Sequence, residues 1–275
     1  MAKRKISETA KEYGRGVVGG LLFSLPLLYT MEVWWTGFIA SPEKLLAFIG
    51  FTFLLLLGYN RHAGMRPDAS FKEILHESVE EITLAFIVAF LFLLLINKIS
   101  ITMSFREIAG KVIVESMIVA IGVSVGTAQL GQKDKKAKQQ EKKRKEGLFQ
   151  MVVLCICGAV LISSSVAPTE EIFRIAVVSK ASHLLFMIVV SILISGIILF
   201  FSDFKGTGGF EGGILKMALH LFISYLCALL VSFLMLWFFD RISGNGWNFI
   251  LAEVIVLAIP ATLGASAGRL LIDNG

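Results

Sequence analysis

The chain has 275 residues, of which 56% are hydrophobic and 17% are charged, and its formal net charge at pH 7 is +5. Its mean hydropathy is +0.77. These polar residues are too few to cover a water-soluble globule of this length, so the composition excludes that class and predicts an integral membrane protein.

Long apolar segments follow one another along the chain, and a helix needs roughly 20 mostly apolar residues to cross a bilayer. We predict eight spans, at residues 16–40, 44–59, 79–97, 108–130, 147–167, 183–201, 214–239 and 248–271. The second is short, and the number of spans falls to seven if residues 44–59 are re-entrant. The predicted fold is therefore all-α, a polytopic membrane protein with about eight transmembrane helices.

The distribution of Lys and Arg predicts the orientation of the chain. With a cytoplasmic N-terminus, 19 of the 26 basic residues fall in inner segments and 7 in outer ones, which is the bias of cytoplasmic loops. We therefore expect a multi-pass protein of the bacterial cytoplasmic (inner) membrane with both termini in the cytoplasm. Residues 131–146 become a basic cytoplasmic linker that attracts anionic membrane lipid. The alternative is that this linker binds nucleic acid or a protein partner. We do not expect nucleic acid to be its ligand.

An internal likeness indicates a duplication. Residues 111–126 align without a gap with residues 253–268, and six of the sixteen positions are identical. Offsets of 138 to 142 extend the alignment over the flanking segments. We therefore predict two parallel four-helix repeats, residues 1–130 and 147–275, with the linker between them and a pathway along their common axis. The small residues of GVSVG and GASAG allow close helix contacts in lipid.

Acidic residues occur at matching ends of two predicted spans. The offset of 138 places Glu32 on Glu170, and Glu171 follows directly. Glu32 precedes Trp34 and Trp35, whose rings favour the membrane interface. Carboxylates at this level would form an outer mouth that concentrates cations, and a homodimer would place four such positions around one axis. The alternative is that these side chains are simply hydrated at the headgroup level.

A second acidic group lies at the inner end of the third span. Glu73, His76, Glu77 and Glu80 share one helical stripe, and Glu81 is four residues after Glu77. Crowded acids repel one another unless a cation or proton binds among them, so Glu77, Glu80 and Glu81 are a candidate cation or proton entry. The alternative is a solvated helix end. A His and a Glu four residues apart also suit a transition metal, and the identity of any metal stays open.

Other charged residues lie deeper in the predicted spans. Lys111 aligns with Glu253, so we predict a structural ion pair between the halves, with pairing of Lys111 to Glu115 as an alternative. Glu115 is otherwise a candidate proton relay. His220 is a candidate pH-sensitive group on the pathway.

Parts of this sequence resemble two protein families. The segments LPLLY and MEVWW, followed by SVEEI and PTEE, resemble an uncharacterised family of bacterial multi-pass membrane proteins with no assigned function. The segment APTEEIFR is similar to the EExxxR motif of glutamate-type intramembrane proteases, with Glu170, Glu171 and Arg174 spaced EExxR. That resemblance implies that these three residues converge with His183 and His220 in an active site.

Three functions are therefore considered. The leading hypothesis is a cation-transporting membrane protein, either a channel or a proton-coupled carrier, whose partners are lipid, inorganic cations or protons, and a second copy of the chain. The alternatives are an enzyme, namely a glutamate-type intramembrane protease, and a membrane scaffold or sensor that uses the linker. No cofactor is expected.

Overall fold

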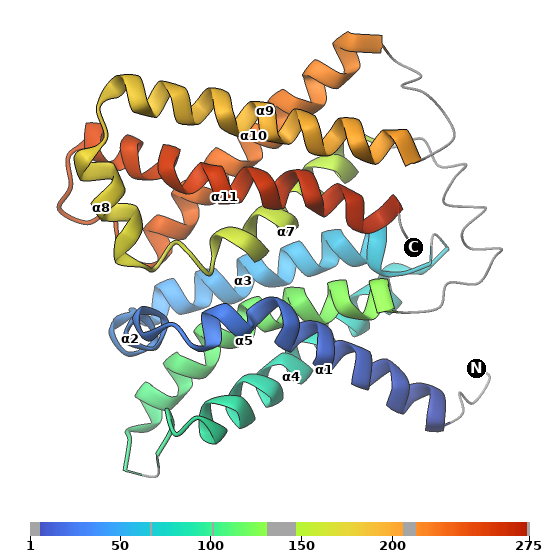
Figure 1. The fold of residues 1–275 in the computed structure, drawn as a ribbon. Coiled ribbons are helices and arrows are strands. Elements are labelled where there is room, and N and C mark those ends of the chain that lie inside the picture. Colours follow the sequence, from blue (N-terminus) through green and yellow to red (C-terminus); the bar gives the residue numbers. More distant parts are fainter. Residues whose placement is uncertain (1–5, 67, 101, 131–146, 206–212, 274–275) are drawn as a thin grey trace. The chain divides into compact units, whose positions relative to one another are not determined.

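The computed structural model describes residues 6–66, 68–100, 102–130, 147–205 and 213–273. Every regular element in these ranges is a helix (Figure 1), which confirms the predicted all-α membrane fold. The chain divides into two compact units at residues 146 and 147. The predicted linker, residues 131–146, lies outside the described residues.

The first unit is built around its last helix. Its elements are α1 (Ile6–Leu28), α2 (Met31–Ile39), α3 (Pro42–Tyr59), the π-helical turn η1 (Asn60–Gly64), α4 (Phe71–Leu95) and α5 (Phe105–Leu130). Helix α5 packs against α1, α2, α3 and α4. From residue 110 to residue 126, every side chain of α5 except that of Ile113 is buried. The interior of the unit is therefore the surface of this one helix.

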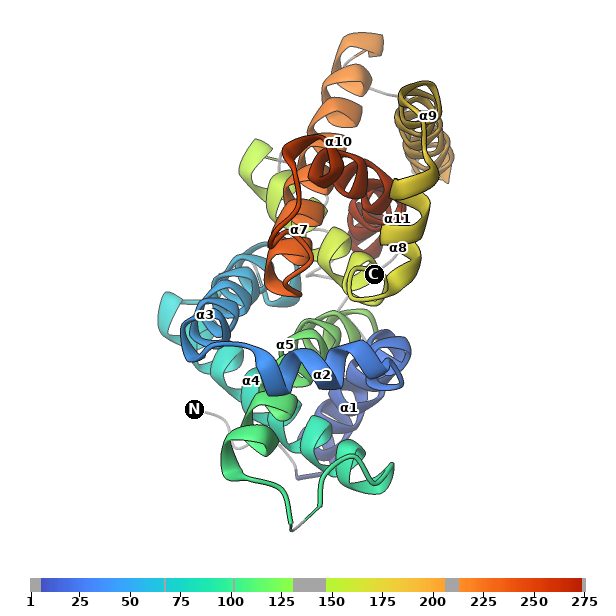
Figure 2. The same ribbon diagram turned by 90° about the vertical axis from the view of Figure 1, so that its left-hand side faces the viewer.

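The second unit has the same order of long and short helices. Its elements are α7 (Leu148–Ser163), α8 (Glu170–Val178), α9 (Ala181–Lys205), α10 (Gly213–Phe238) and α11 (Trp247–Asp273). Helix α11 packs against the four others and lies among them in Figure 2. The last helix is thus central in each unit.

Glycines hold α1 against α5 in the first unit. A Cβ on Gly19 would overlap backbone atoms of Gly122 and Gly126. Backbones that approach this closely gain the dispersion contacts that drive helix association in lipid, where apolar burial between helices gives little. The GVSVG segment thus has the packing role expected from its small residues.

The second unit repeats this contact with different residues. A Cβ on Gly158 of α7 would overlap the backbone of Gly264 and approach that of Gly268 on α11. Gly158 therefore has the surroundings of Gly19, at an offset of 139. Helices α2 and α8, and helices α3 and α9, also begin 139 residues apart. An offset of 139 would place Glu32 on Glu171, whereas the alignment offset of 138 places it on Glu170.

The α4 and α10 helices end in the same way. Asn97 and Asp240, two residues beyond these helices, have φ angles of 59° and 60°. Asn and Asp tolerate this left-handed region better than most residues. In both cases the next backbone N–H reaches back into the helix, from Lys98 to Leu93 O and from Arg241 to Leu236 O.

The predicted number of spans needs correction. Helices occupy all eight predicted ranges, but among the described residues six are long and apolar enough to cross a bilayer, or seven if α1 and α2 form one broken span. Residues 16–40 are not one straight span, because Thr30 is extended and α2 leaves α1 at 87°. Helix α7 has 16 residues, about 24 Å of length, which is less than the roughly 30 Å of a hydrocarbon core.

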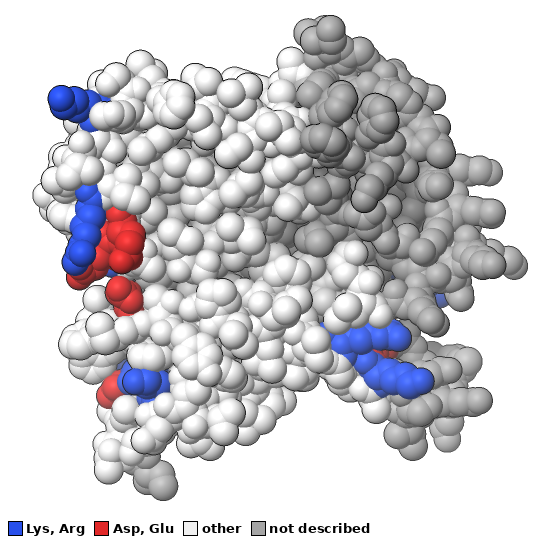
Figure 3. Space-filling model, viewed as in Figure 1, with Lys and Arg blue, Asp and Glu red and all other residues white. Residues whose placement is uncertain are grey.

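The short second span is longer than predicted. Helix α3 continues through η1, and the combined segment Pro42–Gly64 has 23 residues, enough to cross a bilayer without a re-entrant loop. Its start is set by Ser41, whose hydroxyl accepts a hydrogen bond from the Lys44 N–H, and by Pro42 at the first helical turn. In Figure 3 the first unit, in the lower part of the view, has Lys, Arg, Asp and Glu residues at its two ends and uncharged surface between them.

The glycine contacts predict which small substitutions damage the fold. Gly19→Ala and Gly158→Ala should each lower the free energy of unfolding by about 1–3 kcal/mol, because the added methyl group forces two backbones apart. Gly14→Ala and Gly50→Ala are matched controls, since a Cβ on either glycine meets nothing within 4 Å. They should be neutral or slightly stabilising. Thermal unfolding in detergent, followed by circular dichroism, measures this; equal midpoints for all four variants would contradict it.

Candidate functional site

A group of polar side chains is buried among α3, α4 and α5 of the first unit. The Asn60 amide donates hydrogen bonds to Glu81 Oε2 at 2.7 Å and to Ser78 Oγ at 3.1 Å. The Ser124 hydroxyl donates to Asn60 Oδ1 at 3.0 Å. Glu81 is 4% exposed, and the other three are 1% exposed or less. We call these four residues the Glu81 cluster.

Local backbone structure places each member of this cluster. Asn60 begins the η1 turn, and π-helical turns of this kind are frequent at functional sites. Gly64 closes the turn, and a Cβ there would collide with Asn60 Oδ1. Helix α4 starts with a capping box between Ser70 and Glu73, which sets the register of Glu81.

Glu81 is the member of this cluster that borders an acidic cavity. The cavity has a volume of about 190 Å³ and is lined by Glu12 and Tyr13 of α1, Glu77, Glu80, Glu81 and Leu84 of α4, and Val123 and Thr127 of α5. Four carboxyl groups therefore border one space, at the end of the unit where α1 and α4 begin and α5 ends. Like charges that border one cavity repel one another, and this repulsion favours the binding of a cation or a proton among them.

The structure brings together three of the predicted site residues. Glu77, Glu80 and Glu81 line the same cavity, while Glu12 and Asn60 were not predicted. Asn60 carried a signal in the sequence, because it is an amide directly after a long apolar segment and before Gly64. Glu12 carried none, since it precedes the predicted first span and only the tertiary packing of α1 against α4 and α5 brings it to the cavity.

The histidine beside this cavity does not complete a metal site. His76 Nδ1 lies 3.4 Å from Glu80 Oε1, and both side chains are well exposed. Among the described residues, no group of three or more His, Cys, Asp or Glu side chains is arranged to hold a metal ion.

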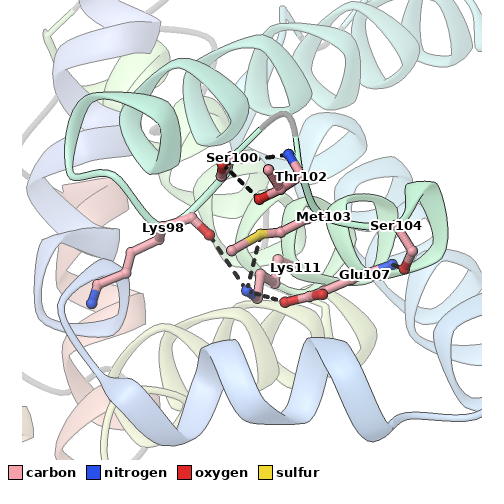
Figure 4. A network of polar contacts seen from close by, with 7 residues as sticks. All are labelled: Lys98, Ser100, Thr102, Met103, Ser104, Glu107 and Lys111. Carbon is pink, nitrogen blue, oxygen red and sulfur yellow. Dashed lines mark hydrogen bonds and ion pairs between the residues drawn. The ribbon is translucent and has the colours of Figure 1, made fainter.

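At the opposite end of the first unit, Lys111 has partners that were not predicted. Its ammonium lies 2.7 Å from Glu107 Oε1 and 3.4 Å from Lys98 O, and Met103 Sδ completes the surroundings (Figure 4). The Lys111 side chain is 10% exposed. Lys111 thus forms its ion pair with Glu107, one turn closer to the start of α5. The predicted pair of Lys111 with Glu253 of the other unit stays a prediction.

Trp34 of α2 lies beside this group. The Lys98 ammonium lies 4.2 Å from the centre of the Trp34 ring, a cation–π distance. The indole N–H donates to Leu28 O at 3.2 Å. These contacts hold the short helix α2 at its angle to α1.

Glu115 is the buried acid of α5. It is 0% exposed, and neither carboxyl oxygen has a hydrogen-bond partner among the described residues. Glu253 of α11 is likewise buried without a hydrogen bond in the described part of the chain, and Arg241 is its charged neighbour.

The second unit has neutral polar pairs where the first has the Glu81 cluster. The Ser195 and Ser266 hydroxyls lie 2.6 Å apart, and Cys155 Sγ lies 3.4 Å from Ser224 Oγ. Ser266 is the alignment partner of Ser124. The buried acid cluster is therefore a feature of the first unit among the residues described.

The predicted outer acids lie on the short helices α2 and α8. Glu32 is half-buried, whereas Glu170 and Glu171 are exposed. The Glu170 carboxylate lies 2.9 Å from Arg174 within α8. The backbone N–H of Glu171 itself and the Thr169 hydroxyl hold the pKa of the Glu171 carboxyl below its usual range.

The two histidines of the protease resemblance lie on other helices of the second unit. His183 is exposed near the start of α9, and His220 is half-buried on α10. The pairing of Glu170 with Arg174 is a local contact on an exposed helix face, which is unlike an enclosed acid of an active site.

A polytopic helical membrane protein is the class that these helices and buried charges define. A family model covers residues 12–272, and the chain belongs to that family, "Putative integral membrane protein (DUF2391)". The expected membership in a membrane-protein family without an assigned function is thereby confirmed. No curated protein and no solved structure matches the chain.

The Glu81 cluster predicts a stability change. Asn60→Leu should lower the free energy of unfolding by about 1–3 kcal/mol, because Glu81 loses its amide donor while buried. Adding Glu81→Leu should recover part of this loss, since the buried acid without its donor is then gone and only the Ser124 hydroxyl still lacks its partner on Asn60. Asn248→Leu, at an exposed position of α11, is the control. Chemical denaturation in mixed micelles measures the differences, and an additive double variant would contradict the contact.

The Lys111 pair can be compared with an exposed pair of the same spacing. Glu107→Gln should destabilise by about 1–3 kcal/mol, because it leaves a largely buried ammonium without its charged partner. Glu170→Gln, whose partner Arg174 is 72% exposed, should cost less than about 1 kcal/mol. Thermal midpoints of the two variants test this, and Lys111→Met should rescue Glu107→Gln. Equal losses would show that burial does not matter here.

Proposed function

We propose that this protein moves cations across the membrane, as a channel or a proton-coupled carrier, and that the Glu81 cluster is its cation-binding site. The observation that carries the proposal is a glutamate that is 4% exposed, hydrogen-bonded by Asn60, and part of the wall of a four-carboxyl cavity. A role in cation binding explains why the buried acid Glu81 lies within the apolar helix α4.

Energetics support this assignment. An acid in the middle of a membrane helix costs at least about 2.5 kcal/mol on insertion scales, so such residues mark ion or proton pathways. Glu81 is the eleventh residue of α4, about 15 Å from the helix start. Its amide donor lowers this cost without removing it, and a bound cation would remove more.

The chemistry of the Glu81 cluster favours small hard cations. Carboxylate, amide and hydroxyl oxygens are the ligands that such ions prefer. The Glu81 carboxylate, the Asn60 carbonyl oxygen and the Ser124 hydroxyl supply all three kinds within one cluster. The other carboxylates of the cavity would raise the local cation concentration at its mouth.

The rest of the pathway is proposed from the sequence. Glu32, Glu170 and Glu171 would attract the ion at the outer end, and His220 would adjust its passage. The shared helix order and glycine contacts support two homologous repeats with a pathway between them. We also infer a homodimer in the bacterial inner membrane with both termini in the cytoplasm.

Ion flux tests the cavity directly. The purified chain in liposomes should carry at least one of Na⁺, K⁺, Ca²⁺ or H⁺ down a gradient, and Glu81→Gln should reduce that flux at least tenfold, because the charge is lost while the shape is kept. Glu43→Gln, at an exposed position of α3, should leave the flux unchanged.

Two outcomes would count against the proposal. Equal flux for Glu81→Gln and the unmutated chain would remove Glu81 from the pathway. Absence of flux for every ion in the unmutated chain would remove transport itself.

A further inference from the structure

Glu115 is a buried acid away from the cavity. It is ten residues from the start of α5 and fifteen from its end, so about 15 Å and about 22 Å of helix lie on its two sides. It is fully buried, and its two carboxyl oxygens have no hydrogen-bond partner among the described residues. A carboxyl group thus lies deep in an apolar segment, and the Trp34 indole is the polar side chain that acts on it.

No charged side chain in the described part of the chain compensates this carboxyl group. Lys111, one turn away on the same helix, has its ammonium 2.7 Å from Glu107 Oε1 and is directed to the loop that contains Lys98 (Figure 4). Helix α2 contributes the Trp34 indole, which acts on Glu115 as a polar neighbour. From α1, α3 and α4, which also pack on α5, no charged side chain of a described residue acts on it.

The apolar interior around Glu115 limits which ion its carboxyl group can bind. An isolated carboxylate in an apolar interior is costly and is neutralised by a proton or a cation. A metal cation takes about six oxygen ligands, whereas Glu115 offers its own two oxygens and the indole is a donor. A proton needs a single oxygen.

We propose that Glu115 is a proton-binding site in the interior of the first unit, and that it holds a proton at neutral pH. The ligand is H⁺, and the Trp34 indole is the group that adjoins it. This inference stands on Glu115 alone and does not depend on the cavity at Glu81. It goes beyond the proposed function by assigning a second ion site and its ligand.

Infrared spectroscopy distinguishes a carboxylic acid from a carboxylate by its C=O stretching band. The full chain would be reconstituted in phosphatidylcholine vesicles and studied in D₂O at neutral pD. Glu115→Gln should remove the band of one carboxylic acid, which should also fade as the pD of the unmutated chain is raised. Glu43→Gln should remove carboxylate intensity instead, because that side chain is exposed.

Two results would overturn the inference. One is loss of carboxylate intensity in Glu115→Gln, since it would mean that the group is ionised. The other is absence of any protonated-glutamate band in the unmutated chain labelled with carbon-13 glutamate, which needs no variant to fold. Since neither measurement involves transport, a chain without flux can still show the Glu115 band, and the two proposals fail separately.

Discussion

Close contact between glycine backbones is the constraint on which the rest of each unit depends. In lipid, apolar side chains gain little by leaving hydrocarbon for a protein interior, so helices associate where small residues allow their backbones to touch. Gly19 meets Gly122 and Gly126 in this way. The contact makes α5 central and buries its sequence from residue 110 to residue 126. Ser124 and Glu115 are buried because they belong to that segment.

The two units share this framework but differ in the polar groups that it encloses. Gly158, Gly264 and Gly268 repeat the glycine contact, and Asp240 repeats the helix end at Asn97. Glu81 and Asn60 have no such repetition, because the second unit has serine and cysteine pairs in its interior. The two units thus share glycine contacts and differ in their polar interiors, since packing glycines are hard to replace while a polar interior can change.

The sequence predicted the helical content and the acidic group on α4, because apolar length and helical spacing are local properties. It did not predict the break at Thr30, because the apolar pattern continues through the bend and only backbone angles end α1. Nor did it identify the partners of Lys111, since alignment compares positions and not the direction of a side chain. The role of Asn60 was not predicted, because it depends on a π-helical turn that brings the amide to Glu81, 21 residues further along the sequence.

The depths of the two buried acids of the first unit constrain any mechanism. Ser124, a member of the Glu81 cluster, is nine residues from Glu115 along α5, so about 14 Å of helix separates Glu115 from that cluster. Between them α5 presents Ser116, whose hydroxyl donates to the Ile113 carbonyl, and then seven apolar or small residues that are all buried. Along that stretch of seven residues α5 itself supplies no side-chain oxygen. If the protein transports ions as proposed, a direct path along α5 from the Glu81 cluster to Glu115 would therefore suit a proton better than a metal cation.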